Sequence, residues 1–115
     1  MKVAIIGYGY VGKAMHKLFP DAMTYDTQVA CSFPEDVLEE DCKRAINTCG
    51  IAFVCVPTPA IEEGKLDTSI VEEVIKWCQC PLIIIRSTLN PSTADYLEQK
   101  YKKNIVVMPE YVGES

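Results

Sequence analysis

The chain has 115 residues, of which 49% are hydrophobic and 23% are charged. Domains most often have roughly 100 to 150 residues, so this length predicts a single domain over residues 1–115 and excludes two catalytic domains. The 11 basic and 16 acidic residues give a net charge of -5, which argues against nucleic acid and anionic membrane surfaces as partners.

The amino terminus predicts neither export nor a membrane span. Its apolar run, Val3–Ile6, stops at Gly7 and is too short for a signal-peptide core or a transmembrane helix. We therefore expect the cytoplasm. The six cysteines and one histidine lack the spacing of metal ligands, so we expect reduced thiols and no metal site.

The first 50 residues predict strand, helix, strand and a less regular helix. Val3–Ile6 and Ala22–Tyr25 have the apolar character of buried strands. Between residues 28 and 50 the pattern is weaker: Ser32 to Glu35 fits a capping box, and we expect one short or broken helix. The intervening helix has apolar residues at helical spacing, namely Val11, Ala14, Met15 and Leu18.

The rest of the chain continues the alternation. Strand segments are Ile51–Val56, Leu82–Ile85 and Ile105–Met108. An apolar stripe over residues 70–78 predicts a helix capped by Asp67, and another helix is expected from near Ser92, with Asp95 in its first turn. Alternating strands and helices predict an α/β fold: a Rossmann-like, doubly wound, mostly parallel sheet of about five or six strands with flanking helices.

The segment Gly7-Tyr8-Gly9-Tyr10-Val11-Gly12 is the strongest local motif. It follows the first strand and opens the first helix, where G-x-G-x-x-G binds a dinucleotide: Gly7 permits the tight turn, Gly9 lets a pyrophosphate approach, and Gly12 allows close packing. The helix N-terminus then faces the anion.

Asp26, at the end of the second strand, strengthens this interpretation. A carboxylate at this spacing can accept hydrogen bonds from ribose hydroxyls, and its charge repels a 2′-phosphate. The motif and Asp26 together predict NAD rather than NADP as the cofactor. The alternative is an ordinary turn aspartate at a strand end.

Polar residues follow three further strands. Pro57 and Thr58 come after the third strand, Thr88 after the fourth and Glu110 after the fifth. Because ligands bind beyond the carboxyl ends of such strands, Thr58 can reach the cofactor, and Thr88 and Glu110 can hold a water or an alcohol. A helix-cap threonine and a solvated glutamate explain Thr88 and Glu110 equally well.

Four separated segments resemble, in order, the amino-terminal domain of the UDP-glucose/GDP-mannose dehydrogenase family. They are the glycine motif, Val56-Pro57-Thr58-Pro59 with Asp67 and Ser69 downstream, Arg86-Ser87-Thr88 and Pro109-Glu110-Tyr111. The resemblance implies NAD-dependent oxidation of the C6 alcohol of a nucleotide sugar, such as UDP-glucose, to a carboxylate. It also implies that Thr88 and Glu110 position or activate water, and that the following residues touch NAD or lie beside it: Gly7, Gly9, Tyr10, Val11, Gly12, Asp26, Thr58 and Thr88.

The chain also departs from the family pattern. Family members continue into a central helix and a second domain that carries the cysteine nucleophile, and none of the cysteines here has that context. The segment between Asp26 and Val56 is shorter than usual, and Ser92 replaces a glycine. We expect an NAD-binding module that is incomplete as a lone catalyst. It should act on a nucleotide sugar only if another polypeptide segment supplies the missing second domain. Its expected partner is a second copy of itself or a complementing chain. The alternative is a non-catalytic, stand-alone dinucleotide-binding or regulatory module.

Overall fold

The computed structural model describes residues 1–26, 38–62 and 65–108. Strands and helices alternate along most of the chain, as predicted. In order they are β1 (Val3–Ile6), α1 (Tyr10–Leu18), β2 (Met23–Tyr25), α2 (Glu39–Ile46), β3 (Ile51–Val54), β4 (Ala60–Glu62), β5 (Lys65–Leu66), α3 (Ser69–Trp77), β6 (Leu82–Ile85), α4 (Pro91–Tyr101) and β7 (Ile105–Val107).

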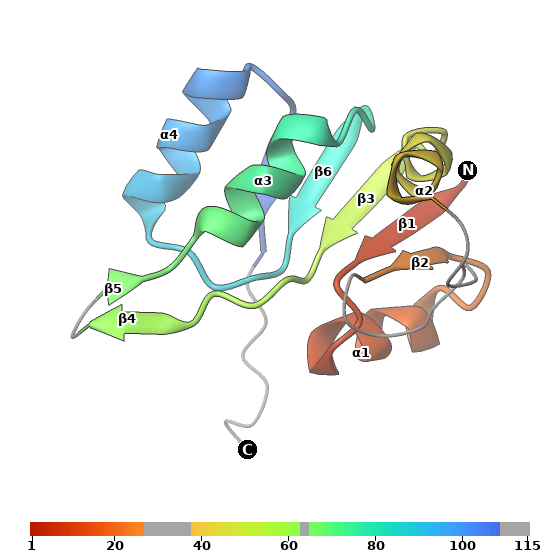
Figure 1. Cartoon of the computed structure of the whole chain (residues 1–115), viewed down its shortest axis with the longest axis horizontal. Coiled ribbons are helices and arrows are strands. Elements are labelled where there is room, and N and C mark those ends of the chain that lie inside the picture. The colour runs from red at the N-terminus through yellow and green to blue at the C-terminus, as the bar shows by residue number, and fades with distance from the viewer. Residues whose placement is uncertain (27–37, 63–64, 109–115) are drawn as a thin grey trace.

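Five strands form one parallel sheet in the order β2-β1-β3-β6-β7 (Figure 1). This confirms the predicted α/β, Rossmann-like fold, although β2, β3 and β7 are one or two residues shorter than expected. The chain leaves β1 toward β2 on one side and returns to β3 on the other, so the strand order reverses between β1 and β3. Ligands of doubly wound sheets bind at such a switch point, beyond the carboxyl ends of the strands.

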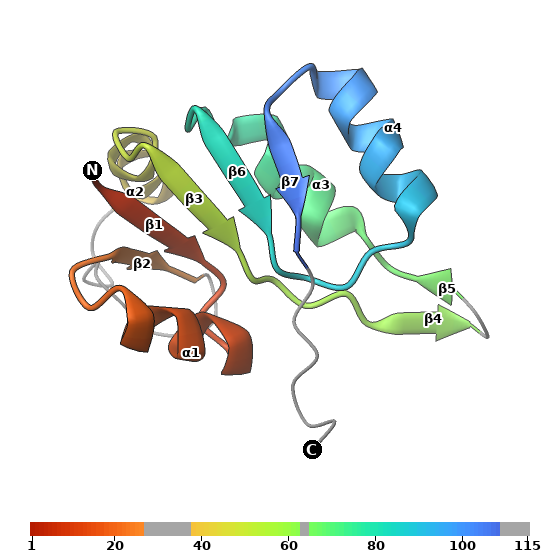
Figure 2. The same ribbon diagram turned by 180° about the vertical axis from the view of Figure 1, so that it is seen from behind.

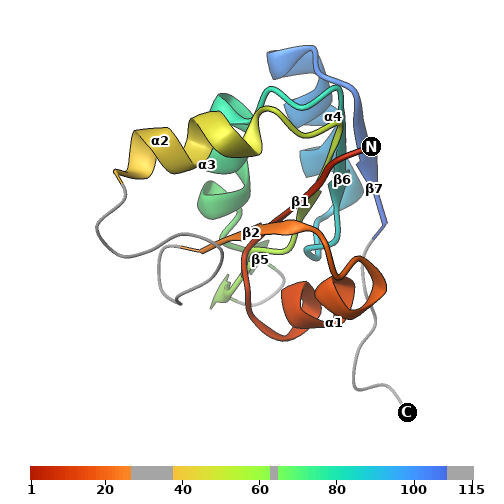
Figure 3. The same ribbon diagram turned by 90° about the vertical axis from the view of Figure 1, so that its right-hand side faces the viewer.

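The helices cover both faces of the sheet (Figure 3). On one face Ile46 of α2, Ile75 of α3 and Leu97 of α4 pack into a single apolar cluster with the strands. On the other face Met15 of α1 packs against Ile5. Burial on both faces explains why the strands are apolar throughout rather than alternating.

One row of side chains crosses the sheet on the α1 face. Ile5 lies opposite Phe53, Phe53 opposite Ile84, and Ile84 opposite Val106. Ile5 is 0% exposed and Phe53 8%, whereas Val106 is 40% exposed. On this face no helix of the described residues lies in front of β6 and β7 (Figure 2). We call these four residues the crossing row.

The end of α1 differs from the sequence prediction. Leu18 is 70% exposed and Ala14 is also exposed, so their placement on the buried stripe was wrong. Phe19, which is 37% exposed, lies four residues after the buried Met15, and its amide donates to the Met15 carbonyl. Its ring stacks on Phe53 with centroids 5.3 Å apart.

The starts of α3 and α4 both differ from the sequence prediction. Thr68, not Asp67, occupies the N-cap position of α3 and makes no side-chain cap hydrogen bond. Asp67 stands one residue earlier, where its Oδ1 accepts hydrogen bonds from the Ser69 amide at 3.0 Å and the Ser69 hydroxyl at 2.7 Å. Helix α4 begins at Pro91, and its first turn contains no acidic residue. Asp95 therefore lies in the second turn, and its predicted first-turn position was wrong.

Helix α2 lies where one short helix was expected. Only Cys42 and Ile46 of its residues are buried, and they are four positions apart on one face. So short a stripe explains why the apolar pattern was weak. The predicted capping box, Ser32 to Glu35, lies outside the described residues.

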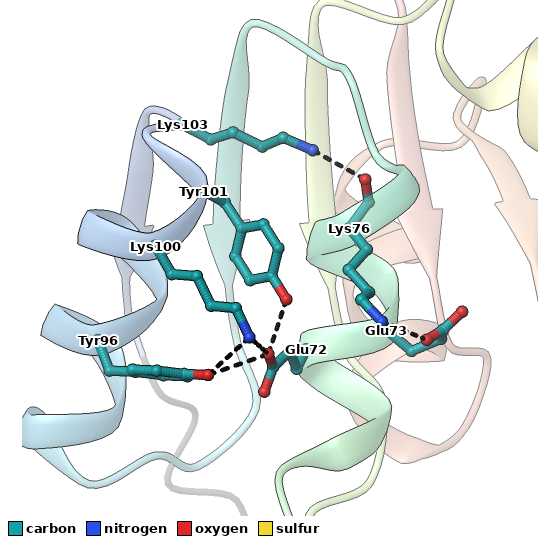
Figure 4. Close-up of polar contacts among 7 residues, drawn as sticks. All are labelled: Glu72, Glu73, Lys76, Tyr96, Lys100, Tyr101 and Lys103. Carbon is teal, nitrogen blue, oxygen red and sulfur yellow. Dashed lines mark hydrogen bonds and ion pairs between the residues drawn. The ribbon is translucent and has the colours of Figure 1, made fainter.

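The half-buried carboxylate of Glu72 joins α3 to α4 (Figure 4). Glu72 Oε2 accepts hydrogen bonds from the Tyr101 hydroxyl at 2.7 Å, the Lys100 ammonium at 3.0 Å and the Tyr96 hydroxyl at 3.3 Å. These donors, Tyr101 foremost, hold the pKa of Glu72 below its ordinary value. The contacts fix how α4 lies against α3.

Lys103 holds the other end of α3. Its ammonium donates to three backbone carbonyls at the C-terminus of this helix, those of Ile75, Lys76 and Cys78. The last carbonyls of a helix have no partner within the helix and carry partial negative charge, so a lysine there satisfies and neutralises them.

Candidate functional site

The glycine-rich loop joins β1 to α1 at the switch point. Gly7 has φ of 95°, and a Cβ on it would lie 2.7 Å from the carbonyl atoms of Cys55 in the neighbouring chain segment. Both the left-handed conformation and this close approach exclude a side chain. The predicted tight turn at Gly7 is therefore present.

The other two motif glycines differ from each other. A Cβ on Gly12 would lie 2.0 Å from the Gly7 carbonyl oxygen, so Gly12 lets the helix approach the loop. Around Gly9 no atom of the described residues lies within 4 Å of an added Cβ. Folding therefore does not require a glycine there, whereas close approach of a ligand to the backbone does.

The N-terminus of α1 is arranged as an anion site. Gly9 occupies the N-cap position without a side-chain hydrogen bond, and the first turn has no acidic residue. The first amides of a helix have no acceptor within the helix, and the helix dipole is positive there. The amides of Tyr10 and Val11 thus lie at the positive end of the helix, a position that in other proteins binds anions such as a pyrophosphate.

Asp26 is tied to this loop. Its Oδ2 accepts a hydrogen bond from the Tyr8 amide at 2.6 Å, and the residue is half-buried at the end of β2. The contact sets the carboxylate beside the glycine-rich loop, where a ribose attached to the pyrophosphate lies in dinucleotide-binding domains.

A cavity of about 850 Å³ joins these elements. Its size and its lining, mostly apolar with a few converging polar groups, are typical of small-molecule sites. The predicted site residues that line it come from four loops and are Gly7, Gly9, Tyr10, Val11, Asp26, Pro57, Thr58 and Thr88. Gly12 is buried behind the loop instead, and Glu110 lies outside the described residues.

A serine connects the loops that carry the two threonines. The buried Ser87 hydroxyl donates to the Val56 carbonyl at 2.6 Å. This hydrogen bond joins the end of β6 to the end of β3, and so fixes Thr88 relative to Thr58. Thr58 is half-buried and Thr88 is exposed, and both line the cavity.

Sequence reasoning missed one wall of the cavity, which α2 and α3 supply. From α3 it contains Ile70, Val74 and Trp77 at helical spacing, and from α2 it contains Glu39 and Lys43. The half-buried Trp77 ring also packs against the core. The spacing of 70, 74 and 77 was the available signal.

Tyr25 lies where this wall meets the sheet. Its hydroxyl donates to Glu39 Oε1 at 3.2 Å, and its ring meets the Trp77 ring edge-on with centroids 5.9 Å apart. Burial and then the Glu39 carboxylate raise the pKa of Tyr25 to about 12. The hydroxyl therefore stays protonated at neutral pH and donates.

Side chains suited to metal binding do not cluster in this cavity. Within residues 1–26, 38–62 and 65–108, no three His, Cys, Asp or Glu side chains gather as metal ligands. The described cysteines are buried, and of these Cys55 lines the cavity. His16, the one histidine, is half-buried, and its Nδ1 lies 2.7 Å from the Tyr8 hydroxyl. No helix in the described part of the chain is long and apolar enough to cross a bilayer.

The switch-point cavity, the glycine-rich turn and the strand-end carboxylate define a Rossmann-type dinucleotide-binding domain. Residues 34–115 match the model of the UDP-glucose/GDP-mannose dehydrogenase family, NAD binding domain. The chain belongs to this family, its cofactor is NAD, and the resemblance found in its motifs is confirmed. The glycine motif and Asp26 precede the matched range, so their roles depend on the geometry above.

Two solved structures share the fold. GDP-mannose dehydrogenase from Pseudomonas aeruginosa, solved as a ternary complex, aligns with TM-score 0.70 and 22% identity over 100% of this chain and 37% of its own. A UDP-glucose dehydrogenase from the hyperthermophilic archaeon Pyrobaculum islandicum aligns with TM-score 0.66 and 19% identity over 96% of this chain and 36% of its own. The chain thus spans little more than a third of either enzyme. A search of curated proteins gave no match.

Proposed function

We propose that this chain is the cofactor-binding part of a nucleotide-sugar 6-dehydrogenase that oxidises the C6 alcohol of UDP-glucose, or of a similar sugar nucleotide, to a carboxylate. The observation that carries the proposal is one cavity at the switch point of the sheet, lined by the glycine-rich loop, Asp26, Thr58 and Thr88. Family membership and the two structural relatives, named as nucleotide-sugar dehydrogenases, support the reaction class.

Each group in the cavity has a distinct task in this proposal. The amides of Tyr10 and Val11 hold the pyrophosphate at the helix N-terminus. Asp26 accepts hydrogen bonds from the adenosine ribose and repels a 2′-phosphate, which favours NAD over NADP. Pro57 stiffens the loop after β3 and so orients the Thr58 hydroxyl toward the cofactor.

The chemical step takes place beyond the ends of β6 and β7. Bound NAD would supply the hydride acceptor for each of the two oxidations. Thr88 lines this end of the cavity and orients water or the alcohol through its hydroxyl. We assign Glu110 to the same water as a proton acceptor, on the strength of the family resemblance.

We further propose that the sugar site and the nucleophile come from additional polypeptide, in a longer chain, a second copy or a complementing subunit, and that the protein works in the cytoplasm. The alignments support this division, since each relative has nearly two thirds of its length outside the region aligned with this chain. The 115-residue chain should then bind NAD and turn over poorly.

Calorimetric titration of the purified chain with NAD and with NADP tests the cofactor site. We expect NAD to bind with clear preference, and Asp26→Ala to weaken NAD binding by about 1 to 3 kcal/mol, the scale of a lost charged acceptor. Asp21→Ala, which changes an exposed aspartate near the other end of β2, is the matched control. Equal affinity for the two cofactors, or unchanged NAD affinity in Asp26→Ala, would contradict the assignment.

A further inference from the structure

The cavity extends past Asp26 into a space between α2 and α3, which we call the α2–α3 crevice. Both helices cover the same face of the sheet (Figures 1 and 3). One wall is the α3 stripe of Ile70, Val74 and Trp77, and the opposite wall carries Glu39 and Lys43, four residues apart on α2. One side of the crevice is thus apolar, and the other carries two charged groups.

These two charged groups are held in place. The Lys43 ammonium lies 5.4 Å from the centroid of the Trp77 ring and 3.5 Å from Glu39 Oε1. Glu39 Oε1 also accepts the Tyr25 hydroxyl at 3.2 Å. The Lys43 side chain is 27% exposed and the Glu39 side chain 61%, so Lys43 is a partly desolvated cation whose position is set by an aromatic face and a more solvated carboxylate. A donor and an acceptor therefore stand side by side on one wall.

Such a pair distinguishes purines. The Watson–Crick edge of adenine presents an acceptor, N1, beside an amino donor, N6, whereas hypoxanthine and guanine present an N–H donor beside an acceptor, O6. An ammonium can only donate and an ionised carboxylate can only accept. Lys43 and Glu39 therefore match adenine at both positions and mismatch a 6-oxopurine at both.

We propose that Lys43 and Glu39 determine the specificity of the cofactor site for adenine over 6-oxopurines, with the base lying in the α2–α3 crevice. The proposal rests on the placement of the ribose at Asp26, because that placement directs the base into the crevice. Ile70 and Val74 cover one face of the base.

The test compares NAD with its deaminated analogue, in which hypoxanthine replaces adenine. Calorimetry on the full chain should show NAD binding about tenfold or more tightly, because the analogue leaves two polar groups mismatched. Lys43→Met should lower this affinity ratio by about threefold or more, because it removes the donor to N1 while Glu39 still favours the amino group, and Lys43→Arg should restore the ratio. Lys17→Met, on the exposed surface of α1, is the matched control and should keep the wild-type ratio.

Glu39→Gln tests the role of the carboxylate independently of Lys43. An amide can rotate to accept from N6 or to donate to O6, so this variant should bind the analogue more tightly than the wild type does. Trp77 is the one tryptophan of the chain, so its fluorescence should change with adenosine monophosphate and not with nicotinamide mononucleotide. Circular dichroism of each variant shows whether it is folded.

The outcomes separate this inference from the cofactor assignment. If the wild type binds neither dinucleotide, the proposed NAD site itself is wrong. If NAD binds and Asp26→Ala weakens it, but the wild type does not discriminate between the dinucleotides or Lys43→Met keeps the discrimination, then the NAD site stands and the roles of Lys43 and Glu39 are refuted.

Discussion

Substituting alanine at Gly12 and at Gly9 should separate the structural from the ligand-binding role of the glycine motif. At Gly12 the added Cβ would lie 2.0 Å from the Gly7 carbonyl oxygen and 3.0 Å from its carbonyl carbon. Both are backbone atoms of a turn that has its own left-handed constraint, so they cannot rotate away. At Gly9 the same methyl group meets nothing within 4 Å among the described residues.

The expected magnitudes follow from these contacts. Overpacking costs about 1 to 3 kcal/mol and occasionally more, and a contact this short belongs at the upper end. The higher helix propensity of alanine offsets about 1 kcal/mol of that cost. Gly12→Ala should therefore lose about 2 kcal/mol of stability, or roughly 8 °C in Tm for a domain of this size.

Gly9→Ala should behave in the opposite way. Its stability should remain within about 0.5 kcal/mol of the wild type, because its methyl group faces open space. Its NAD affinity should nevertheless fall by about tenfold or more, since that space is where the pyrophosphate approaches the backbone.

Thermal unfolding followed by circular dichroism, together with NAD titration of all three proteins, measures both effects. Wild-type stability in Gly12→Ala would show that the close approach does not constrain the fold. Wild-type NAD affinity in Gly9→Ala would show that the pyrophosphate lies elsewhere.

Three further predictions concern the residues around the site. The lowered pKa of Glu72 means that its stabilising contribution is present above its ordinary pKa of 4.5 and is lost as the pH falls through the lower, folded-state value. Urea titrations should therefore show an acid-side loss of stability that is smaller in Glu72→Gln. The pKa of Tyr25 is raised from 10.0 to about 12, so its contribution is complete below pH 10 and disappears as the pH rises through 12. In an alkaline tyrosinate absorbance titration, Tyr25→Phe should remove absorbance that develops near pH 12, and loss of absorbance near pH 10 instead would contradict the burial of this hydroxyl. Lys103→Met should lower stability by about 1 to 3 kcal/mol, because three helix-end carbonyls lose a charged donor, and Lys102→Met on the exposed neighbour should change little.

Much of the sheet was predictable because its strands are buried on both faces. Segments such as Val3–Ile6 and Leu82–Ile85 are apolar throughout and need no tertiary information to be recognised. The pair β4 and β5 was missed for the opposite reason. Every residue of β4 is exposed, so no apolar pattern marks the strand, and its pairing with β5 forms a separate two-stranded sheet.

The candidate site was predictable where it lies at strand ends, and not where helices form it. Asp26, Thr58 and Thr88 line one cavity because the carboxyl ends of parallel strands meet at the same edge. Lys43 lines it only because α2 is rotated about its axis so that Lys43 faces Trp77. That rotation is set by how α2 packs on the sheet. Because α2 has only two buried residues, its apolar pattern was too weak to predict the rotation from the sequence.

The crossing row has a consequence for how the sheet opens. From Ile5 to Phe53 to Val106, its exposure rises from 0% to 8% to 40%. Amide hydrogen exchange occurs through local opening events, whose free energy is lower where fewer apolar contacts must be broken. Backbone amides of β1 and β3 should therefore exchange only when the whole domain unfolds, whereas those of β7 should exchange through a smaller opening that leaves the cofactor cavity intact. Strand β7, at the edge of the sheet farthest from β2, would then unfold as a separate cooperative unit.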